Sequence, residues 1–138
     1  MAKPYAERVP LVFDTSAWNR QGEAHVSDRW MTTLEAGLLA ACPVVTLEVL
    51  RGAPDEARRE ALDRALTDLA HHRNAPITRE ICDMALSASR ELRGDRRGIP
   101  AVDLLIAAAA TARGFGVLHD DRHFDRLSRV LGFETVRV

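Results

Sequence analysis

The stretch VPLVFDTS, residues 9–16, changes from apolar to polar at a single position. A short apolar run is typical of a strand buried in a parallel sheet, whereas Asp, Thr and Ser are residues that cap helices. The same change recurs late in the chain, where GVL (residues 116–118) is followed by His119, Asp120 and Asp121. Both stretches predict a buried strand with polar groups at its carboxyl end.

Segments with helical spacing of apolar residues separate the expected strands. The expected helices are residues 26–41, 46–52, 54–72, 78–92, 102–113 and 124–131. The expected strands are residues 9–13, 43–45, 75–77 (marginal), 116–118 and 133–138 at an edge. Strands that alternate with helices imply a mainly parallel sheet covered on both faces. The chain is therefore predicted to form one domain over residues 1–138, a three-layer α/β/α sandwich.

Composition narrows the classes of function. The chain has 138 residues and a net charge of -1, from 19 basic and 20 acidic groups, which argues against a protein that coats nucleic acid through bulk charge. Cys42 and Cys82 have no zinc-ligand spacing and no disulfide framework, so we expect them to fill the core. The longest apolar stretch, near 104–112, is too short for a membrane span. We therefore expect a cytoplasmic protein without membrane contact.

Carboxylates follow several of the expected strands. Asp14 follows the first strand and Glu48 follows the second by a few residues, in the first turn of the expected helix. Asp103 opens a later helix, and Asp120 and Asp121 follow the strand near the C-terminus. The carboxyl ends of parallel strands are where such sheets bind ligands. We therefore expect these carboxylates to converge at one edge of the sheet.

Any one of these acids is explained by helix capping, but a group of them needs another explanation. Converging carboxylates repel one another unless a cation lies between them. Oxygen ligands without a Cys/His cluster favour Mg²⁺ or Mn²⁺ over softer metals. Such an ion binds phosphate oxygens, which predicts phosphodiester hydrolysis by a metal-activated or carboxylate-assisted water. The number of ions stays open.

Four motifs carry a resemblance to a known family. They are VFDTS (residues 12–16), TLEVLRG (46–52), DLLIA (103–107) and VLHDDRHF (117–124). In this order, and across almost the whole chain, they resemble PIN-domain proteins. More narrowly, they resemble the VapC-type toxin, the ribonuclease half of a bacterial VapBC toxin–antitoxin pair.

The resemblance implies roles for individual residues. It favours Asp121 over Asp120, because the family motif places its acid two residues after the position of His119. Ser16 is implied as a hydrogen-bonding support near the metal. The residues implied to bind the catalytic metal are Asp14, Glu48, Asp103 and Asp121.

The resemblance also implies the partners and the activity. The expected protein is a Mg²⁺-dependent endoribonuclease toxin, with Mn²⁺ as a second candidate ion and RNA as the substrate. A cognate VapB-type antitoxin is expected to cover the acidic site, and the chain is expected to form a homodimer.

Several residues near these motifs have competing interpretations. Many relatives carry an acid where this chain has His123, which leaves contact with phosphate, metal binding as a neutral imidazole, or an exposed histidine; we favour the exposed histidine. Asp125 and Arg129 have the spacing of a surface ion pair. Trp18 is expected to pack over the helix layer rather than stack on a base.

The charged loop ahead of Asp103 offers a local basic surface. Its arginines Arg93, Arg96 and Arg97 are candidates for contact with RNA phosphates, and a solvated loop is the alternative.

Two other functions compete with the nuclease. A phosphoryl-accepting receiver domain needs a lysine late in the chain, and the sole lysine is Lys3. A PIN-like module that binds RNA or a partner without cutting is compatible with intact acids.

Overall fold

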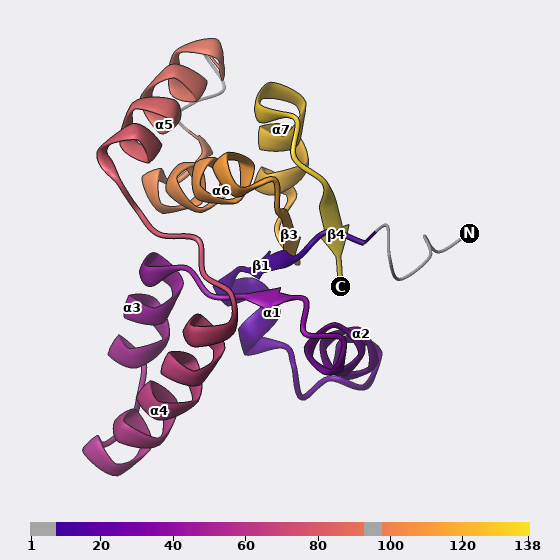
Figure 1. Cartoon of the computed structure of the whole chain (residues 1–138), viewed down its shortest axis with the longest axis vertical. Helices are drawn as coiled ribbons and strands as arrows, with labels where there is room; N and C mark the ends of the chain where they lie inside the picture. The colour runs from indigo at the N-terminus through magenta and orange to yellow at the C-terminus, as the bar shows by residue number, and fades with distance from the viewer. Residues whose placement is uncertain (1–7, 93–97) are drawn as a thin grey trace.

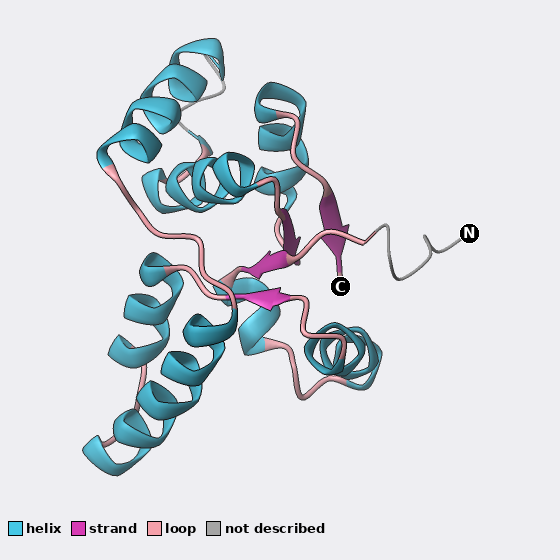
Figure 2. Cartoon of the chain, viewed as in Figure 1, coloured by secondary structure: helices cyan, strands magenta, loops and turns pink. Residues whose placement is uncertain are grey.

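The computed structural model describes residues 8–92 and 98–138, which form a four-stranded sheet between two layers of helices (Figures 1 and 2). All strand pairs are parallel, in the order β2-β1-β3-β4. The strands are β1 (Leu11–Phe13), β2 (Leu39–Ala40), β3 (Gly116–His119) and β4 (Thr135–Arg137). The three-layer α/β/α sandwich predicted from the sequence is confirmed.

The helices divide into two groups. The described helices are α1 (Thr15–Asn19), α2 (Ala24–Glu35), α3 (Pro43–Arg51), α4 (Glu56–His72), α5 (Arg79–Leu92), α6 (Ala101–Arg113) and α7 (Arg122–Leu131). Figure 1 shows α5, α6 and α7 on one side of the sheet and α1 to α4 on the other. None of the helices in the described ranges combines the length and apolar character that crossing a membrane requires.

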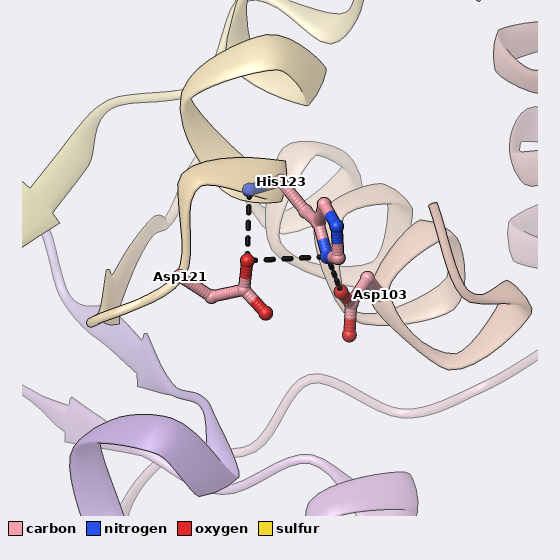
Figure 3. A group of neighbouring side chains, drawn as sticks. All are labelled: Asp103, Asp121 and His123. Atoms are coloured by element: carbon pink, nitrogen blue, oxygen red, sulfur yellow. Dashed lines mark hydrogen bonds and ion pairs between the residues drawn. The ribbon is translucent and has the colours of Figure 1, made fainter. Parts of the chain in front are cut away.

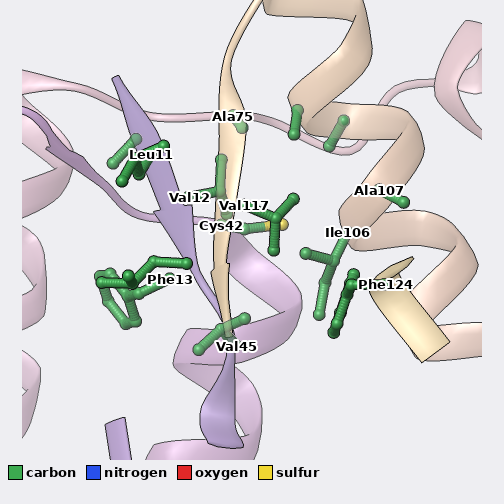
Figure 4. Packing of buried hydrophobic residues seen from close by; sticks show 14 of the residues in the cluster. Leu11, Val12, Phe13, Cys42, Val45, Ala75, Ile106, Ala107, Val117 and Phe124 are labelled. Atoms are coloured by element: carbon green, nitrogen blue, oxygen red, sulfur yellow. The ribbon is translucent and has the colours of Figure 1, made fainter. Parts of the chain in front are cut away.

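The core lies between the sheet and the helices on each side of it. Every residue of β1 and of β3 is buried, as expected for central parallel strands. Ile106 of α6 and Phe124 of α7 pack with Val117 in the buried cluster that Figure 4 draws. Helix α6 is the most central helix of its layer, because it buries Asp103 and Leu104 as well as Ile106 and the alanines that follow. The short alanine side chains let the helix lie close to the sheet.

The second strand differs from the prediction. Pro43–Val45 was expected to be a strand but forms the first turn of α3. Proline is favoured there because the first helical N–H has no partner within the helix. The strand is instead β2, which lies inside the segment expected to be helical. Helix α2 ends before it, and Gly37, with φ 68°, turns the chain into the strand.

Other local predictions have mixed outcomes. Thr78 caps α5 as expected, since its Oγ1 accepts a hydrogen bond from the Ile81 N–H at 3.3 Å. Residues 75–77 form no strand; the pairing beside them is a single parallel bridge between Ala41 and Asn74. Cys42 is buried, whereas Cys82 is exposed, so its assignment to the core was wrong.

The topology brings two carboxyl ends of strands together. Strand β1 lies between β2 and β3, so the order of strands reverses at β1. The N–H of Asp14, just after β1, donates to the carbonyl of Leu118 in β3 at 2.9 Å. This is the edge at which ligands bind to such sheets.

Candidate functional site

Asp14 lies where β1 meets α1 and is 5% exposed. Its Oδ2 accepts hydrogen bonds from the N–H of Ser16 at 3.1 Å and from the Ser16 Oγ at 2.6 Å. The same Oγ accepts a hydrogen bond from the Asp120 N–H at 2.9 Å. Ser16 therefore orients the Asp14 carboxylate and ties it to the segment that follows β3.

Asp103, Asp121 and His123 form a compact cluster (Figure 3). Asp103 lies in the first turn of α6, and Asp121 caps α7 by accepting the His123 N–H at 2.9 Å. The Nδ1 atom of His123 lies 3.0 Å from Asp103 Oδ2 and 3.1 Å from Asp121 Oδ1. One potential ligand atom from each residue lies within 4.8 Å of the other two. The cluster therefore has the size and donor chemistry of a metal site.

Asp103 shows the electrostatic cost of this arrangement. Burial, together with the negative charges of Asp14 and Asp121, raises the pKa of Asp103 to about 6, although its hydrogen bond with His123 acts in the opposite direction. Carboxylates that repel one another in a buried position bind a cation favourably, because the cation cancels the repulsion. The residues present therefore fit a divalent cation.

Glu48 is the outermost of the predicted acids. It is exposed and lies beyond the first turn of α3, because that helix begins earlier than expected. Its Oε1 accepts a hydrogen bond from the Thr15 Oγ1 at 3.2 Å, and Thr15 directly follows Asp14. Glu48 thus borders the same edge of the sheet but stays outside the compact cluster.

The structure does not place His123 at the exposed position that we favoured from the sequence. Its side chain is only 20% exposed and contacts two carboxylates, so it is not an exposed surface histidine. A histidine two residues after Asp121, in the first turn of a helix, is the local signal that points to this position.

The acids next to the cluster are paired with arginines. Asp120 lies 2.8 Å from Arg20 and 3.5 Å from Arg137, whereas Asp121 contacts His123 in the compact cluster. Asp125 pairs with Arg137 at 3.6 Å rather than with Arg129 as expected. These pairs place arginine side chains on the outer side of the acidic edge, by which we mean the sheet edge that carries Asp14, Glu48, Asp103 and Asp121.

His119 is a residue whose contacts the sequence did not reveal. It is fully buried, and its Nδ1 accepts the N–H of Asp121 at 3.1 Å, which holds the segment carrying that acid. Burial lowers the pKa of the His119 imidazole. Its Nε2 has no hydrogen-bond partner among the described residues.

Trp18 and the arginine loop complete the sequence predictions. Trp18 packs inward as expected, with its ring stacked on Phe13 at a centroid distance of 5.7 Å and edge-on to Trp30. Arg93, Arg96 and Arg97 lie outside the described residues, so their contact with RNA stays a prediction.

Comparison with known proteins places the chain in a family. The PIN domain profile matches residues 11–130. Ribonuclease VapC18 of Mycobacterium tuberculosis is 34% identical over 126 residues, with 88% of this chain and 90% of the relative covered. The chain belongs to the VapC family of PIN-domain proteins. Ribonuclease VapC51 of the same species is 37% identical to this VapC-family chain, covering 88% of it and 87% of the relative.

Solved structures support the same fold for this VapC-family protein. FitAcB from Neisseria gonorrhoeae superposes with a TM-score of 0.70 at 15% identity, covering 91% of this chain and 95% of that chain. VapBC-5 from Mycobacterium tuberculosis superposes with a TM-score of 0.65 at 24% identity, covering 94% and 99%. These structures confirm the fold, and the PIN domain match with the VapC relatives confirms the family resemblance inferred from the four motifs.

Proposed function

We propose that this VapC-family protein is a metal-dependent endoribonuclease that hydrolyses RNA phosphodiester bonds. The observation that carries the proposal is the convergence of Asp103 and Asp121 beside Asp14, which comes from a distant part of the chain. The ribonucleases VapC18 and VapC51, at 34% and 37% identity, support the reaction class.

The residues of the acidic edge have distinct parts in this proposal. Asp103 and Asp121 would hold the cation from the starts of two helices, and Asp14, oriented by Ser16 at the end of β1, would add a third carboxylate beside Asp103. Glu48 completes the set at the solvent side, next to Thr15. The proposed ion is divalent, either Mg²⁺ or Mn²⁺. When bound, such an ion stabilises the negative charge on the phosphate oxygens and lowers the pKa of the water that acts as nucleophile.

RNA cleavage with matched variants tests the proposal. Asp14→Asn keeps the size of the side chain and one oxygen that can accept from Ser16 but removes the charge, so we expect Mg²⁺-dependent cleavage to fall by about 100-fold or more. Asp120→Asn is the control, because Asp120 is paired with Arg20 and Arg137 outside the proposed metal set. Equal cleavage by wild type and Asp14→Asn, or cleavage that persists in EDTA, contradicts the proposal.

We also propose that the nuclease is the toxin of a toxin–antitoxin pair. Its structural neighbours include VapBC-5, which belongs to the VapBC family of toxin–antitoxin systems, and FitAB bound to a DNA fragment. A cationic side chain from an antitoxin would neutralise the acidic edge in place of a metal ion. Expression of the chain alone should arrest growth, and the neighbouring reading frame should restore it. Arrest by Asp14→Asn without RNA cleavage would instead favour a binding module that does not cut.

A further inference from the structure

We propose that His123 is a direct nitrogen ligand of the metal ion, through Nδ1, and that this ligand makes the site prefer Mn²⁺ over Mg²⁺. The inference rests on the proposed metal-dependent function and adds a ligand to its acidic set. It concerns a position where the VapC resemblance leads one to expect a carboxylate and this chain has an imidazole.

The distances in the cluster match those between neighbouring ligands of one ion. In an octahedral site with bonds of about 2.1 Å, adjacent ligand atoms lie about 3.0 Å apart. Nδ1 of His123 lies 3.0 Å from Asp103 Oδ2 and 3.1 Å from Asp121 Oδ1. Nδ1 therefore lies at the spacing of an adjacent ligand from one oxygen of each carboxylate.

The surroundings of His123 hold its ring in this position. Its backbone N–H donates to Asp121 Oδ1 at 2.9 Å in the first turn of α7, so the main chain at His123 is tied to the acid. The side chain is 20% exposed, which limits the alternative rotamers open to it. Figure 3 shows Nδ1 between the two carboxylates, with the other ring nitrogen pointing away from them. Nδ1 hydrogen-bonds to Asp103 Oδ2 in this structure, and the tautomer with its proton on Nε2 would free the Nδ1 lone pair for an ion.

The donor set determines which ion is preferred. Mg²⁺ is a hard cation that takes oxygen ligands and keeps several waters. Imidazole is a ligand for transition-metal ions, and Mn²⁺ accepts carboxylate ligands as well. Replacing one carboxylate by His123 also removes a negative charge, which weakens the attraction for any divalent ion, and the imidazole compensates Mn²⁺ more than Mg²⁺ because Mn²⁺ is a transition-metal ion. A mixed set of Asp103, Asp121 and His123 therefore favours Mn²⁺.

Electron spin echo spectroscopy of the Mn²⁺-loaded full chain, without RNA, tests the ligand directly. A coordinated imidazole gives a ¹⁴N coupling to Mn²⁺, and we expect this coupling in the wild type. It should disappear in His123→Ala, with Mn²⁺ affinity by calorimetry falling roughly tenfold or more. His71→Ala, at an exposed position at the end of α4, is the control and should keep the coupling.

A second variant tests the ion preference. His123→Asp restores an all-oxygen set, so the ratio of Mn²⁺ to Mg²⁺ affinity should fall roughly tenfold relative to wild type. Absence of the ¹⁴N coupling in the wild type overturns the inference, as does its retention in His123→Ala. An unchanged affinity ratio in His123→Asp also overturns it.

The two proposals fail in different ways. A ¹⁴N coupling without RNA cleavage supports the ligand assignment and contradicts the nuclease. RNA cleavage with Mg²⁺, together with no ¹⁴N coupling in the Mn²⁺-loaded protein, supports the nuclease and contradicts the ligand assignment. Failure to bind Mn²⁺ at all overturns the ligand assignment without any measurement on RNA.

Discussion

Asp103 is a carboxyl group whose protonation differs between the folded and unfolded chain. Its pKa is about 6 in the folded state, because of burial and the nearby charges, against 3.8 for an unperturbed group. Between these values the folded state binds more protons than the unfolded state. The stabilising contribution of the protonated group is therefore full below pH 3.8 and is lost as the pH rises through 6.

We predict that Asp103→Asn, in EDTA, is more stable than the wild type near pH 7 and that the difference closes near pH 4. The shift in pKa corresponds to a change of roughly 2–3 kcal/mol in the relative free energy of unfolding. Urea denaturation at several pH values measures this change. Asp68→Asn, at an exposed position of α4, is the control variant and is measured at the same pH values. A pH-independent difference for Asp103→Asn would contradict the assigned pKa.

The contacts of single residues were predictable from the sequence only in part. Placement of Asp14 followed from the strand end, because an apolar run that stops at an acid defines both the strand and its edge. The choice of Asp121 over Asp120 came from the family resemblance. The ring of His123 did not follow, since its position depends on how α7 packs against α6, which carries Asp103. The pairing of Asp120 with Arg20 and Arg137 likewise joins segments that are distant in sequence.

At the scale of elements, the helices were easier to predict than the second strand. Helix ends at Gly114 and Gly132 have left-handed backbone, at φ 69° and 80°, which is a strong local signal. Strand β2 has only two residues, so it owes its existence to pairing with β1 rather than to its own pattern. The residues Pro43–Val45 have the composition of a buried strand, but proline begins a helix equally well.

Gly116, the first residue of β3, allows a close approach between strands. A Cβ at this position would lie 2.6 Å from the carbonyl oxygen of Glu134 and 2.8 Å from Leu11 Cδ2. That carbonyl accepts the hydrogen bond from the Val117 N–H at 2.9 Å, so β4 cannot move away without weakening the bond. The absence of a side chain at Gly116 therefore sets the spacing of the sheet on both sides of β3.

We predict that Gly116→Ala lowers the free energy of unfolding by about 1–3 kcal/mol, as overpacking does in a close-packed core. Gly22→Ala is the matched control, because a Cβ there meets no atom within 4 Å. Urea denaturation compares the two variants with the wild type. Equal stability of all three proteins would show that β3 and β4 tolerate the added methyl group.

At the scale of the whole molecule, near-neutral charge limits how the protein can bind RNA. The net charge of -1 provides no general attraction for a polyanion, and the acidic edge repels phosphate in the absence of a cation. Positive charge must therefore act locally. Arg20 and Arg137 lie beside the edge but are paired with Asp120, whereas Arg93, Arg96 and Arg97 are predicted contacts from the sequence alone.

We predict that RNA binding depends weakly on salt. If about three arginines contact phosphates of a single strand, the logarithm of affinity should fall with that of salt concentration with a slope of about -2. Fluorescence anisotropy of a labelled short RNA with Asp14→Asn, which prevents cleavage, gives this slope. Changing Arg93, Arg96 and Arg97 to Glu in the same background should weaken binding and flatten the slope, while leaving Mn²⁺ affinity unchanged. A slope steeper than about -4 would mean that RNA contacts a much wider basic surface than this chain's balance of charges suggests.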